Sequence, residues 1–414
     1  MHKANQFHVL SFEGPDAYAR AGGIATRVVG LTRALAERGN ETHLWFVGDP
    51  ELPGVDQHDG VHLHRWCQWI SRHHPGGVYA GEHVKCNDFA ASLPPYLMQN
   101  VLGPHLLRGG RAVVIAEEWQ TADAVLHLDW LLRQAGLRDR VTLFWNANNV
   151  FGFERIDWPK LDAAATIVTV SRYMKQRMWA HGVDPVVIPN GLGPESYLVP
   201  ARGGVAELRH RFARRVLLAK VARWDPDKRW LLAMDTVAEL KRRGSRPLLV
   251  ARGGLELHEQ EVIARARHNG LRVVERDGAA RGERGLLDAL SGTHEADVVV
   301  LRSHLDPAAR GTLFQAADAV LANSGHEPFG LVGLEAMAVG GLACTGASGE
   351  DYAHDGHNAL VLQTHDPREF VSLFARVRDD PERSSALRAS GMATALQYAW
   401  PRVVERALLP RLSA

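Results

Sequence analysis

Two successive series of short apolar runs and helical segments limit what this chain can fold into. The first series opens with an apolar run at Phe7–Phe12, a segment of helical apolar spacing from Ile24 to Arg38, and a second apolar run at Thr42–Val47. A strand, a helix and a strand in this order predict a βαβ unit and therefore an α/β fold. The same alternation begins again at Val216–Val221, after a polar stretch with many turn residues at Gly191–Gly204. The sequence therefore predicts two α/β domains with a linker near the middle of the chain.

Length and composition agree with this division. A chain of 414 residues is long for one hydrophobic core, so two domains are expected. The net charge of +1 gives no electrostatic argument for a nucleic-acid partner or an anionic membrane. The N-terminus lacks the apolar core of a signal peptide, no stretch reaches the length of a membrane span, and the three cysteines show no disulfide spacing. We therefore expect a cytoplasmic protein, with domains at 1–192 and 193–395 and a C-terminal helix within 396–414.

The most informative stretch for function is EPFGLVGLE, between Glu327 and Glu335. It follows an apolar run that predicts a buried strand, and the spacing from Gly330 to Ala338 predicts a helix. In an open parallel sheet, ligands bind at the carboxyl ends of the strands, and the free N–H groups of a helix start attract an anion. We therefore expect a phosphate against the N–H groups of Gly330, Leu331 and Val332, between two carboxylates that can hold hydroxyl groups.

This stretch resembles the E-x7-E signature of family 4 retaining glycosyltransferases, the group that includes the glycogen and starch synthases. The resemblance implies the GT-B architecture, in which two Rossmann-like domains face a central cleft, with donor binding mainly on the second domain and acceptor binding on the first. It implies that Glu335 holds the nucleotide ribose. It also implies that Glu327 and the N–H groups after Phe329 orient the donor sugar. A C-terminal helix often crosses back onto the first domain in this family, and the segment Trp400–Leu409 is placed to do so.

A second match lies in KVARWDPDKRW, where Arg223 and Lys228 follow a predicted strand. Two cations on one loop can hold a diphosphate and neutralise the charge that builds on a leaving phosphate. The resemblance assigns them this role, and no metal is then required; the alternative is a solvated charged turn. The same loop carries Asp225-Pro226-Asp227, a D-x-D pattern that other transferases use for Mn²⁺ or Mg²⁺, but here Pro226 favours a turn.

The N-terminus carries a third match, which resembles the opening of glycogen synthases: Arg20, Ala21, Gly22 and Gly23 take the place of Lys-Thr-Gly-Gly. Glycines without Cβ atoms allow the backbone to approach the donor phosphates, although a strand-to-helix turn also needs small residues. Arginine in place of lysine keeps the charge and changes the geometry.

A fourth match, EEWQTA, includes Glu118 and Trp119 and corresponds to a His-Asp-Trp-Gln-Thr segment on the acceptor side of the cleft; a buried tryptophan is an equally good interpretation. One departure follows it. The family usually has a histidine against the donor sugar, whereas this chain has asparagines there, of which Asn148 is the candidate. Asparagine can form the hydrogen bonds of a neutral histidine but cannot transfer a proton. This is tolerable in a front-face mechanism, in which the leaving phosphate accepts the acceptor's proton.

Residues 50–110 interrupt the alternation and are rich in histidine and tryptophan. The spacing of His62, His64 and their neighbours occurs in metal sites, but the absence of cysteine or acidic partners at repeated intervals favours surface or acceptor-loop histidines. The basic run Arg209–Arg215 predicts a solvated helical face, with an anionic acceptor as the alternative.

Taken with these residues, the resemblance implies a retaining, metal-independent glycosyltransferase that moves a hexosyl group, glucose being favoured, from a nucleotide sugar to a hydroxyl acceptor. No cofactor other than the donor is expected. The alternatives are a GT-B sugar phosphorylase or epimerase, and a non-catalytic subunit that binds sugar nucleotides. The sequence does not indicate the nucleotide base, the acceptor, the linkage or the oligomeric state.

Overall fold

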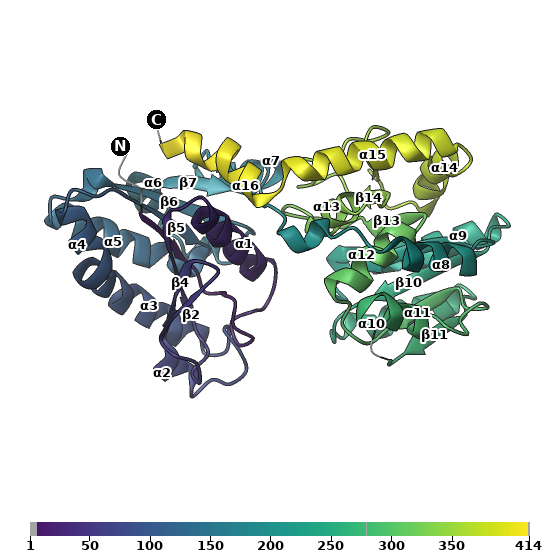
Figure 1. Ribbon diagram of the computed structural model, residues 1–414, viewed down its shortest axis with the longest axis horizontal. Coiled ribbons are helices and arrows are strands. Elements are labelled where there is room, and N and C mark those ends of the chain that lie inside the picture. Colours follow the sequence, from purple (N-terminus) through teal and green to yellow (C-terminus); the bar gives the residue numbers. More distant parts are fainter. Residues whose placement is uncertain (1–5, 279, 413–414) are drawn as a thin grey trace. The chain divides into compact units, whose positions relative to one another are not determined.

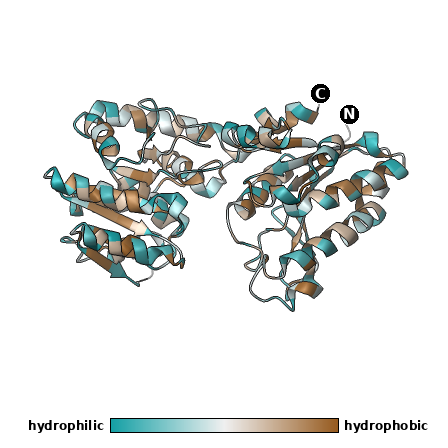
Figure 2. Ribbon diagram, turned by 180° about the vertical axis from the view of Figure 1, so that it is seen from behind, coloured by the Kyte–Doolittle hydropathy of each residue, from teal (hydrophilic) through white to brown (hydrophobic). Residues whose placement is uncertain are grey.

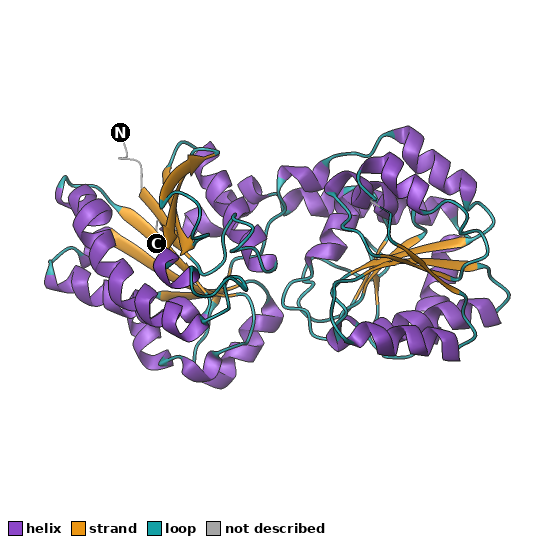
Figure 3. Cartoon of the chain, turned by 90° about the horizontal axis from the view of Figure 1, so that it is seen from below, coloured by secondary structure: helices purple, strands orange, loops and turns teal. Residues whose placement is uncertain are grey.

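The structure is a computed structural model that describes residues 6–278 and 280–412. The chain divides into two compact units: residues up to 191 together with those from 400 onward, and residues 192–399. Each unit is a sheet with helices on its faces (Figure 3). The strands are the most hydrophobic ribbons and the helices are mixed (Figure 2), as expected for parallel sheets buried on both faces.

The first unit contains an eight-stranded sheet in the order β3-β4-β2-β1-β5-β6-β7-β8. All neighbouring strands are parallel except β3, which pairs antiparallel with β4 at one edge. The chain builds outward from β1 through β2, then continues on the other side of β1 with β5, so the order reverses between β1 and β5. The strands are β1 (Gln6–Leu10), β2 (Glu41–Val47), β3 (Val55–His58), β4 (Val61–Trp66), β5 (Ala112–Glu117), β6 (Val141–Ala147), β7 (Thr166–Thr169) and β8 (Val186–Val187).

The C-terminal segment packs on the first sheet together with α1, in one apolar cluster that includes Trp400, Val404 and Leu408. A Cβ atom at Gly30 of α1 would lie 2.0 Å from Trp400 Nε1, so glycine permits this close packing. The expected single helix here changes form, from α16 (Trp400–Val403) to a π-turn at Val404–Leu408 and a 3-10 turn at Leu409–Leu412. The other helices of this unit are α1 (Gly23–Glu37), α2 (Gln68–Ser71), α3 (Glu82–Leu97), α4 (Gly103–Leu107), α5 (Ala122–Gln134), α6 (Trp158–Ala164) and α7 (Arg172–Met178).

The expectation that His62 and His64 lie on the surface or in an acceptor loop is wrong, because both belong to strand β4. His43 stacks on His8 and on His62 with ring centroids 4.7 Å apart in each pair. His64 stacks on Trp45 at 3.7 Å. Burial lowers the pKa of His43 to about 4 and that of His64 to about 3. His43 and His64 are therefore neutral near pH 7, and the stacked rings pack within the sheet.

The second unit contains a seven-stranded parallel sheet in the order β11-β12-β10-β9-β13-β14-β15. Figure 1 labels β10, β11, β13 and β14 of this sheet. Here the order reverses between β9 and β13, since β10 lies on one side of β9 and the chain later returns to its other side. The strands are β9 (Val216–Val221), β10 (Pro247–Arg252), β11 (Val273–Arg276), β12 (Val298–Leu301), β13 (Ala319–Ala322), β14 (Ala343–Thr345) and β15 (Leu360–Val361).

The helices of the second unit cover both faces of this sheet, and α9, α10 and α14 share one apolar cluster with the strands. The expected linker contains a short 3-10 turn at Pro194–Tyr197 and the start of α8. The basic run ends α8, and Arg215 then donates to backbone carbonyls, among them that of Arg246 at 3.0 Å. No helix of the described residues is long and apolar enough to cross a membrane. The helices are α8 (Arg202–Arg211), α9 (Trp230–Arg242), α10 (His258–His268), α11 (Gly282–Ala289), α12 (Pro307–Ala316), α13 (Leu331–Ala338), α14 (Pro367–Arg378) and α15 (Pro381–Gln397).

Candidate functional site

Lys228 and Glu327 meet where the strand order of the second sheet reverses. Lys228 follows β9 and Glu327 follows β13, and these strands are neighbours. Lys228 Nζ lies 2.6 Å from Glu327 Oε2, and the two side chains are 20% and 18% exposed. Ligands of open α/β sheets bind at such a reversal, outside the carboxyl ends of the strands. Two of the predicted catalytic residues are therefore brought together at the expected edge of the sheet.

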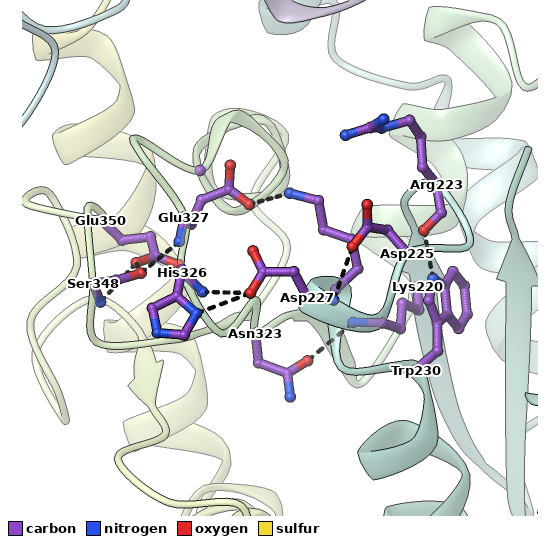
Figure 4. Close-up of polar contacts among 12 residues, drawn as sticks. Lys220, Arg223, Asp225, Asp227, Trp230, Asn323, His326, Glu327, Ser348 and Glu350 are labelled. Carbon is purple, nitrogen blue, oxygen red and sulfur yellow. Dashed lines mark hydrogen bonds and ion pairs between the residues drawn. The ribbon is translucent and has the colours of Figure 1, made fainter. Parts of the chain in front are cut away.

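The D-x-D carboxylates hold these two loops in place (Figure 4). Asp225 accepts a hydrogen bond from the backbone N–H of Asp227 at 2.9 Å and so caps a 3-10 turn. Asp227 Oδ1 accepts hydrogen bonds from the backbone N–H and from Nδ1 of His326, both at 3.1 Å. The backbone carbonyl of Asp227 also accepts from Gly325 N–H at 2.7 Å. Both carboxylates thus have structural partners, as the turn interpretation predicts.

Arg223, the other predicted cation, is exposed on the same loop. Its backbone carbonyl accepts a hydrogen bond from Trp230 Nε1 at 2.7 Å, which fixes the loop onto α9 (Figure 4). Beneath it lies Lys220, a buried lysine that donates to the Leu321 carbonyl at 3.0 Å and to Asn323 Oδ1 at 3.2 Å. Burial lowers the pKa of Lys220 to about 7. Lys220 therefore links the ends of β9 and β13 under the site.

The start of α13 offers backbone N–H groups at the same edge. Gly330 precedes the helix with φ of +82°, and no described side chain caps it. A Cβ atom at this position would lie 2.7 Å from Glu350 Cγ, so only glycine fits. The N–H groups of Leu331 and its neighbours are thus open to an anion. The ring of Phe329, in contrast, packs against Tyr352 and Tyr398, and the residue is only 2% exposed, so its side chain does not face the predicted donor site.

Glu350 supports Glu327 through one serine. The backbone N–H of Glu327 donates to Ser348 Oγ at 2.8 Å, and Ser348 Oγ donates to Glu350 Oε2 at 3.1 Å (Figure 4). Burial, followed by the charge of Glu327, raises the pKa of Glu350 to about 7. Its other oxygen, Oε1, is buried and has no hydrogen-bond partner among the described residues.

Glu335 of α13 lies beside Arg310 of α12, with 3.1 Å between Arg310 Nη2 and Glu335 Oε1. Burial raises the pKa of Glu335, while the guanidinium acts in the opposite direction. Arg310 thus holds the carboxylate that the sequence assigned to a ribose.

In the first unit, a carboxylate already occupies the predicted glycine turn. Glu13 Oε2 accepts hydrogen bonds from the backbone N–H groups of Gly22 at 2.9 Å and Ala25 at 3.0 Å. No atom lies within 4 Å of an added Cβ at Gly22 or Gly23, so neither glycine is required by packing around it. Arg20 is exposed and donates to the Pro15 carbonyl at 3.1 Å.

The predicted acceptor-side residues come together at the ends of β5 and β6. Glu118 is buried with φ of +69°, and its Oε1 accepts the backbone N–H of Asn148 at 2.5 Å. Burial raises the pKa of Glu118 to about 8, so its carboxyl group is mostly protonated at pH 7. Asn148 Nδ2 donates to Glu117 at 2.7 Å. Trp119 is half-buried, and the Arg155 guanidinium lies 4.4 Å from the centroid of its ring.

Comparison with known proteins relates the second unit to a described protein family. The family model described as "Glycosyl transferases group 1" matches residues 210–393, which is nearly all of this unit. The second unit is therefore similar to group 1 glycosyl transferases over nearly its whole length. The predicted glycosyltransferase relationship is thereby confirmed, and the Lys228–Glu327 pair lies inside the group 1 domain.

Relatives and solved structures extend the likeness over the whole chain. A D-inositol 3-phosphate glycosyltransferase of Kineococcus radiotolerans is 26% identical over 94% of this chain and 89% of its own length. Two others, from Thermomonospora curvata and Thermobispora bispora, are 32% and 31% identical, but over only 23% and 27% of this chain and 22% and 26% of their own lengths. The sucrose-phosphate synthase of Thermosynechococcus elongatus has a TM-score of 0.65 at 17% identity, covering 99% of each chain. The starch synthase IV catalytic domain of Arabidopsis thaliana has a TM-score of 0.65 at 16% identity, covering 98% of this chain and 100% of its own. The predicted GT-B fold, with two Rossmann-like domains, is confirmed.

Several residues of the group 1 domain and its neighbour were not found by sequence reasoning. Lys220 lies within an apolar strand, and a lone charge inside such a run is a usable signal. Arg310 carried no signal, because its role depends on a contact with Glu335 of another helix. Gln120 lies in the EEWQTA match, but its contact with Glu82 joins segments far apart in the sequence and was not predicted.

Proposed function

We propose that this protein is a retaining, metal-independent glycosyltransferase that transfers a hexosyl group, glucose being favoured, from a nucleoside diphosphate sugar to a hydroxyl acceptor. The observation that carries the proposal is the meeting of Lys228 and Glu327 at the strand reversal of a group 1 domain. An ammonium, an exposed guanidinium and open helix N–H groups converge on one sheet edge, a combination suited to a diphosphate and the sugar attached to it.

In this proposal Lys228 exchanges its partner when the donor binds. The ammonium leaves Glu327 for the diphosphate, and the freed carboxylate accepts hydrogen bonds from hydroxyl groups of the donor sugar. Arg223 and Lys228 then stabilise the negative charge that develops on the leaving diphosphate as the glycosidic bond to the phosphate breaks. Glu335, held by Arg310, accepts the ribose hydroxyls.

Retention and metal independence follow from the same groups. Two cations supply the charge stabilisation that a metal would otherwise supply, and Asp225 and Asp227 are engaged in holding the loops. Asn148 cannot accept a proton, so the leaving phosphate oxygen accepts the proton of the attacking hydroxyl on the same face of the sugar. The acceptor oxygen then takes the place of the phosphate with the anomeric configuration kept.

A thermal-shift panel with UDP, ADP, GDP and their glucose and mannose conjugates, with and without EDTA, tests this proposal. We expect one nucleotide series to raise the melting temperature to the same extent with and without EDTA, and Lys228→Ala to abolish that shift. A shift that EDTA removes would contradict metal independence. A shift that Lys228→Ala leaves intact would contradict the location of the site.

A further inference from the structure

Arginine side chains line a continuous groove on the second unit, at the edge of the sheet where β9 begins. Three open hollows make up this groove, with volumes of about 660, 520 and 390 Å³. Volumes of about 300–1,000 Å³ are typical of ligand pockets. The first and second hollows share Arg209, Ser385 and Arg388, and the second and third share Phe212 and Arg215. The joined hollows are called the arginine groove below.

The arginine groove is longer than one small anion. Arg202 lines its first hollow and Arg211 its third. These are the first and last residues of α8, a helix of 10 residues. At a rise of about 1.5 Å per residue, α8 extends about 15 Å. A ligand that fills the groove is therefore elongated and can carry several charged groups.

The groove lies at the opposite edge of the second sheet from the predicted donor site. Arg215 of the groove directly precedes β9, whereas Arg223 and Lys228 follow this strand. The six residues of β9 span about 20 Å. An anion in the groove is therefore not the diphosphate of the donor.

Neutral partners hold the guanidinium groups of the groove in place without cancelling their charge. Arg209 donates to the Gln315 carbonyl at 2.8 Å, and Arg388 donates to the Gly340 carbonyl at 3.0 Å. A guanidinium group has five N–H donors, so Arg209 keeps donors for a ligand. Burial first, and then the charge of Arg209, lower the pKa of Arg388 to about 10. The two cations therefore repel each other, and an anion beside them would relieve this repulsion.

Carboxylates in and around the groove balance only part of its positive charge. Four of the arginines that line it form ion pairs, namely Arg211–Glu207, Arg215–Asp297, Arg246–Glu295 and Arg378–Asp379. Four others form no ion pair among residues 6–278 and 280–412: Arg202, Arg209, Arg214 and Arg388. The nearby carboxylates outside these pairs are those of Asp318, which lines the second hollow, Glu283 and Glu382. The groove therefore keeps a positive charge, although the whole chain has a net charge of only +1.

The neutral side chains of the groove favour a saccharide over other polyanions. Ser384, Ser385 and Gln315 place hydroxyl and amide groups beside the arginines, where they can bind sugar hydroxyls. Bases of single-stranded nucleic acids stack on exposed aromatic rings, but Phe212 of the groove is only 3% exposed. Membrane binding grows with the apolar area that is buried, and Met392 is the one exposed large apolar side chain among the described residues of the groove.

We propose that the arginine groove binds an acidic polysaccharide, a chain in which sugar units carry carboxylate or sulfate groups. Guanidinium groups form paired hydrogen bonds with such anions, and the serine and glutamine side chains bind the hydroxyl groups between them. The choice of a saccharide rests on the proposed function, and the inference names the class of glycan on which the proposed glycosyltransferase acts.

Labelled polymers test the proposal on the full chain with Arg223→Ala and Lys228→Ala, so that the cations of the predicted donor site cannot bind the probe. Dissociation constants are measured by fluorescence anisotropy for polygalacturonate, dextran sulfate, neutral dextran and an oligodeoxythymidylate with a matched number of charges. We expect one acidic polysaccharide to bind more tightly than the oligonucleotide and at least tenfold more tightly than dextran. Any other order, or no binding of either acidic polysaccharide, overturns the proposal. Sedimentation with phosphatidylglycerol vesicles in its place would assign the groove to a membrane surface.

Substitutions in the groove locate the binding. Arg209→Gln, where two hollows meet, should weaken binding of the acidic polysaccharide about tenfold, as for loss of one charge-assisted hydrogen bond. Because Arg209 also holds α8 against Gln315, the exposed Arg214 provides a second variant, Arg214→Gln, which should weaken binding several-fold. Arg267→Gln, at an exposed arginine of α10 outside the groove, is the matched control and should not change it. Binding that both groove variants leave unchanged overturns the proposal.

The nucleotide-induced thermal shift of the parent chain separates this inference from the proposed function. The absence of a shift with every nucleotide would indicate failure of the proposed function. An intact shift without binding of an acidic polysaccharide would indicate failure of this inference alone.

Discussion

The two domains have the same kind of strand reversal but opposite chemistry at it. In the second domain, the loop after β9 carries the exposed Arg223 and the mostly buried Lys228, which pairs with Glu327 of the loop after β13, and the uncapped start of α13 lies beside them. In the first domain, the loops after β1 and β5 carry the buried carboxyl groups of Glu13 and Glu118, and Arg27 of α1 is buried in an ion pair with Glu117. The topology therefore places a strand reversal in each domain, and the loop residues decide which charges lie at it.

The largest effect is expected when a cation is removed from the edge of the second sheet. Lys228→Ala and Arg223→Ala should each lower the rate of transfer by roughly 10²–10³-fold while the fold survives, as for loss of one preorganised charge-stabilising group. Single-turnover rates with saturating donor measure the effect. Arg265→Ala, which removes an exposed arginine paired with Asp235 on the surface of the same domain, serves as the control. An unchanged rate in either loop variant would show that its cation does not stabilise the leaving group.

Sequence patterns found the residues of the cationic edge as one group but did not find the contacts that join the residues of the acidic edge, for a physical reason. Glu327, Glu335 and the α13 turn lie within one short stretch of sequence. Residues so close along the chain are also close in the structure, so a sequence pattern can find them together. The strands of the two parallel sheets could also be predicted, because each strand is indicated by its own local run of apolar residues.

Glu13, Tyr79 and Gln120 come from three separate segments, and the histidines of β1, β2 and β4 stack only because strand pairing brings them together. Contacts of this kind depend on register between strands, which single-chain patterns do not specify.

The second prediction, with a smaller expected effect, tests whether the nucleotide is bound by residues of the second domain alone. Glu335→Gln should weaken donor binding about tenfold, since a charged acceptor for the ribose hydroxyls is lost and Arg310 loses its ion pair. Calorimetric titration with the nucleotide that gives the thermal shift measures this. Glu118→Gln, the equivalent change at the edge of the first domain, should leave nucleotide affinity within twofold. If Glu335→Gln removes activity with affinity intact, the roles assigned to Glu327 and Glu335 are wrong.

The smallest effect concerns the buried carboxyl group that each edge contains, Glu118 in the first domain and Glu350 in the second. Burial and the charge of Glu327 raise the pKa of Glu350 to about 7. A bound diphosphate adds negative charge nearby, so the donor binds best to the form in which Glu350 carries its proton. Affinity should therefore be highest near pH 6 and fall as pH rises through 7. A change of about threefold corresponds to a shift of roughly half a pKa unit on donor binding.

Glu350→Gln isolates this contribution, because glutamine stays neutral throughout. Lys220, whose pKa burial lowers to about 7, loses its proton in the same range and weakens donor binding in the same direction. The readout is therefore the difference in slope between the variant and the parent from pH 6 to pH 8, measured by calorimetric titration. Glu382→Gln, at an exposed carboxylate in the first turn of α15, is the control. A slope that Glu350→Gln leaves unchanged would assign the whole pH dependence to Lys220 and the donor, and would leave Glu350 as a structural support for Ser348 and Glu327.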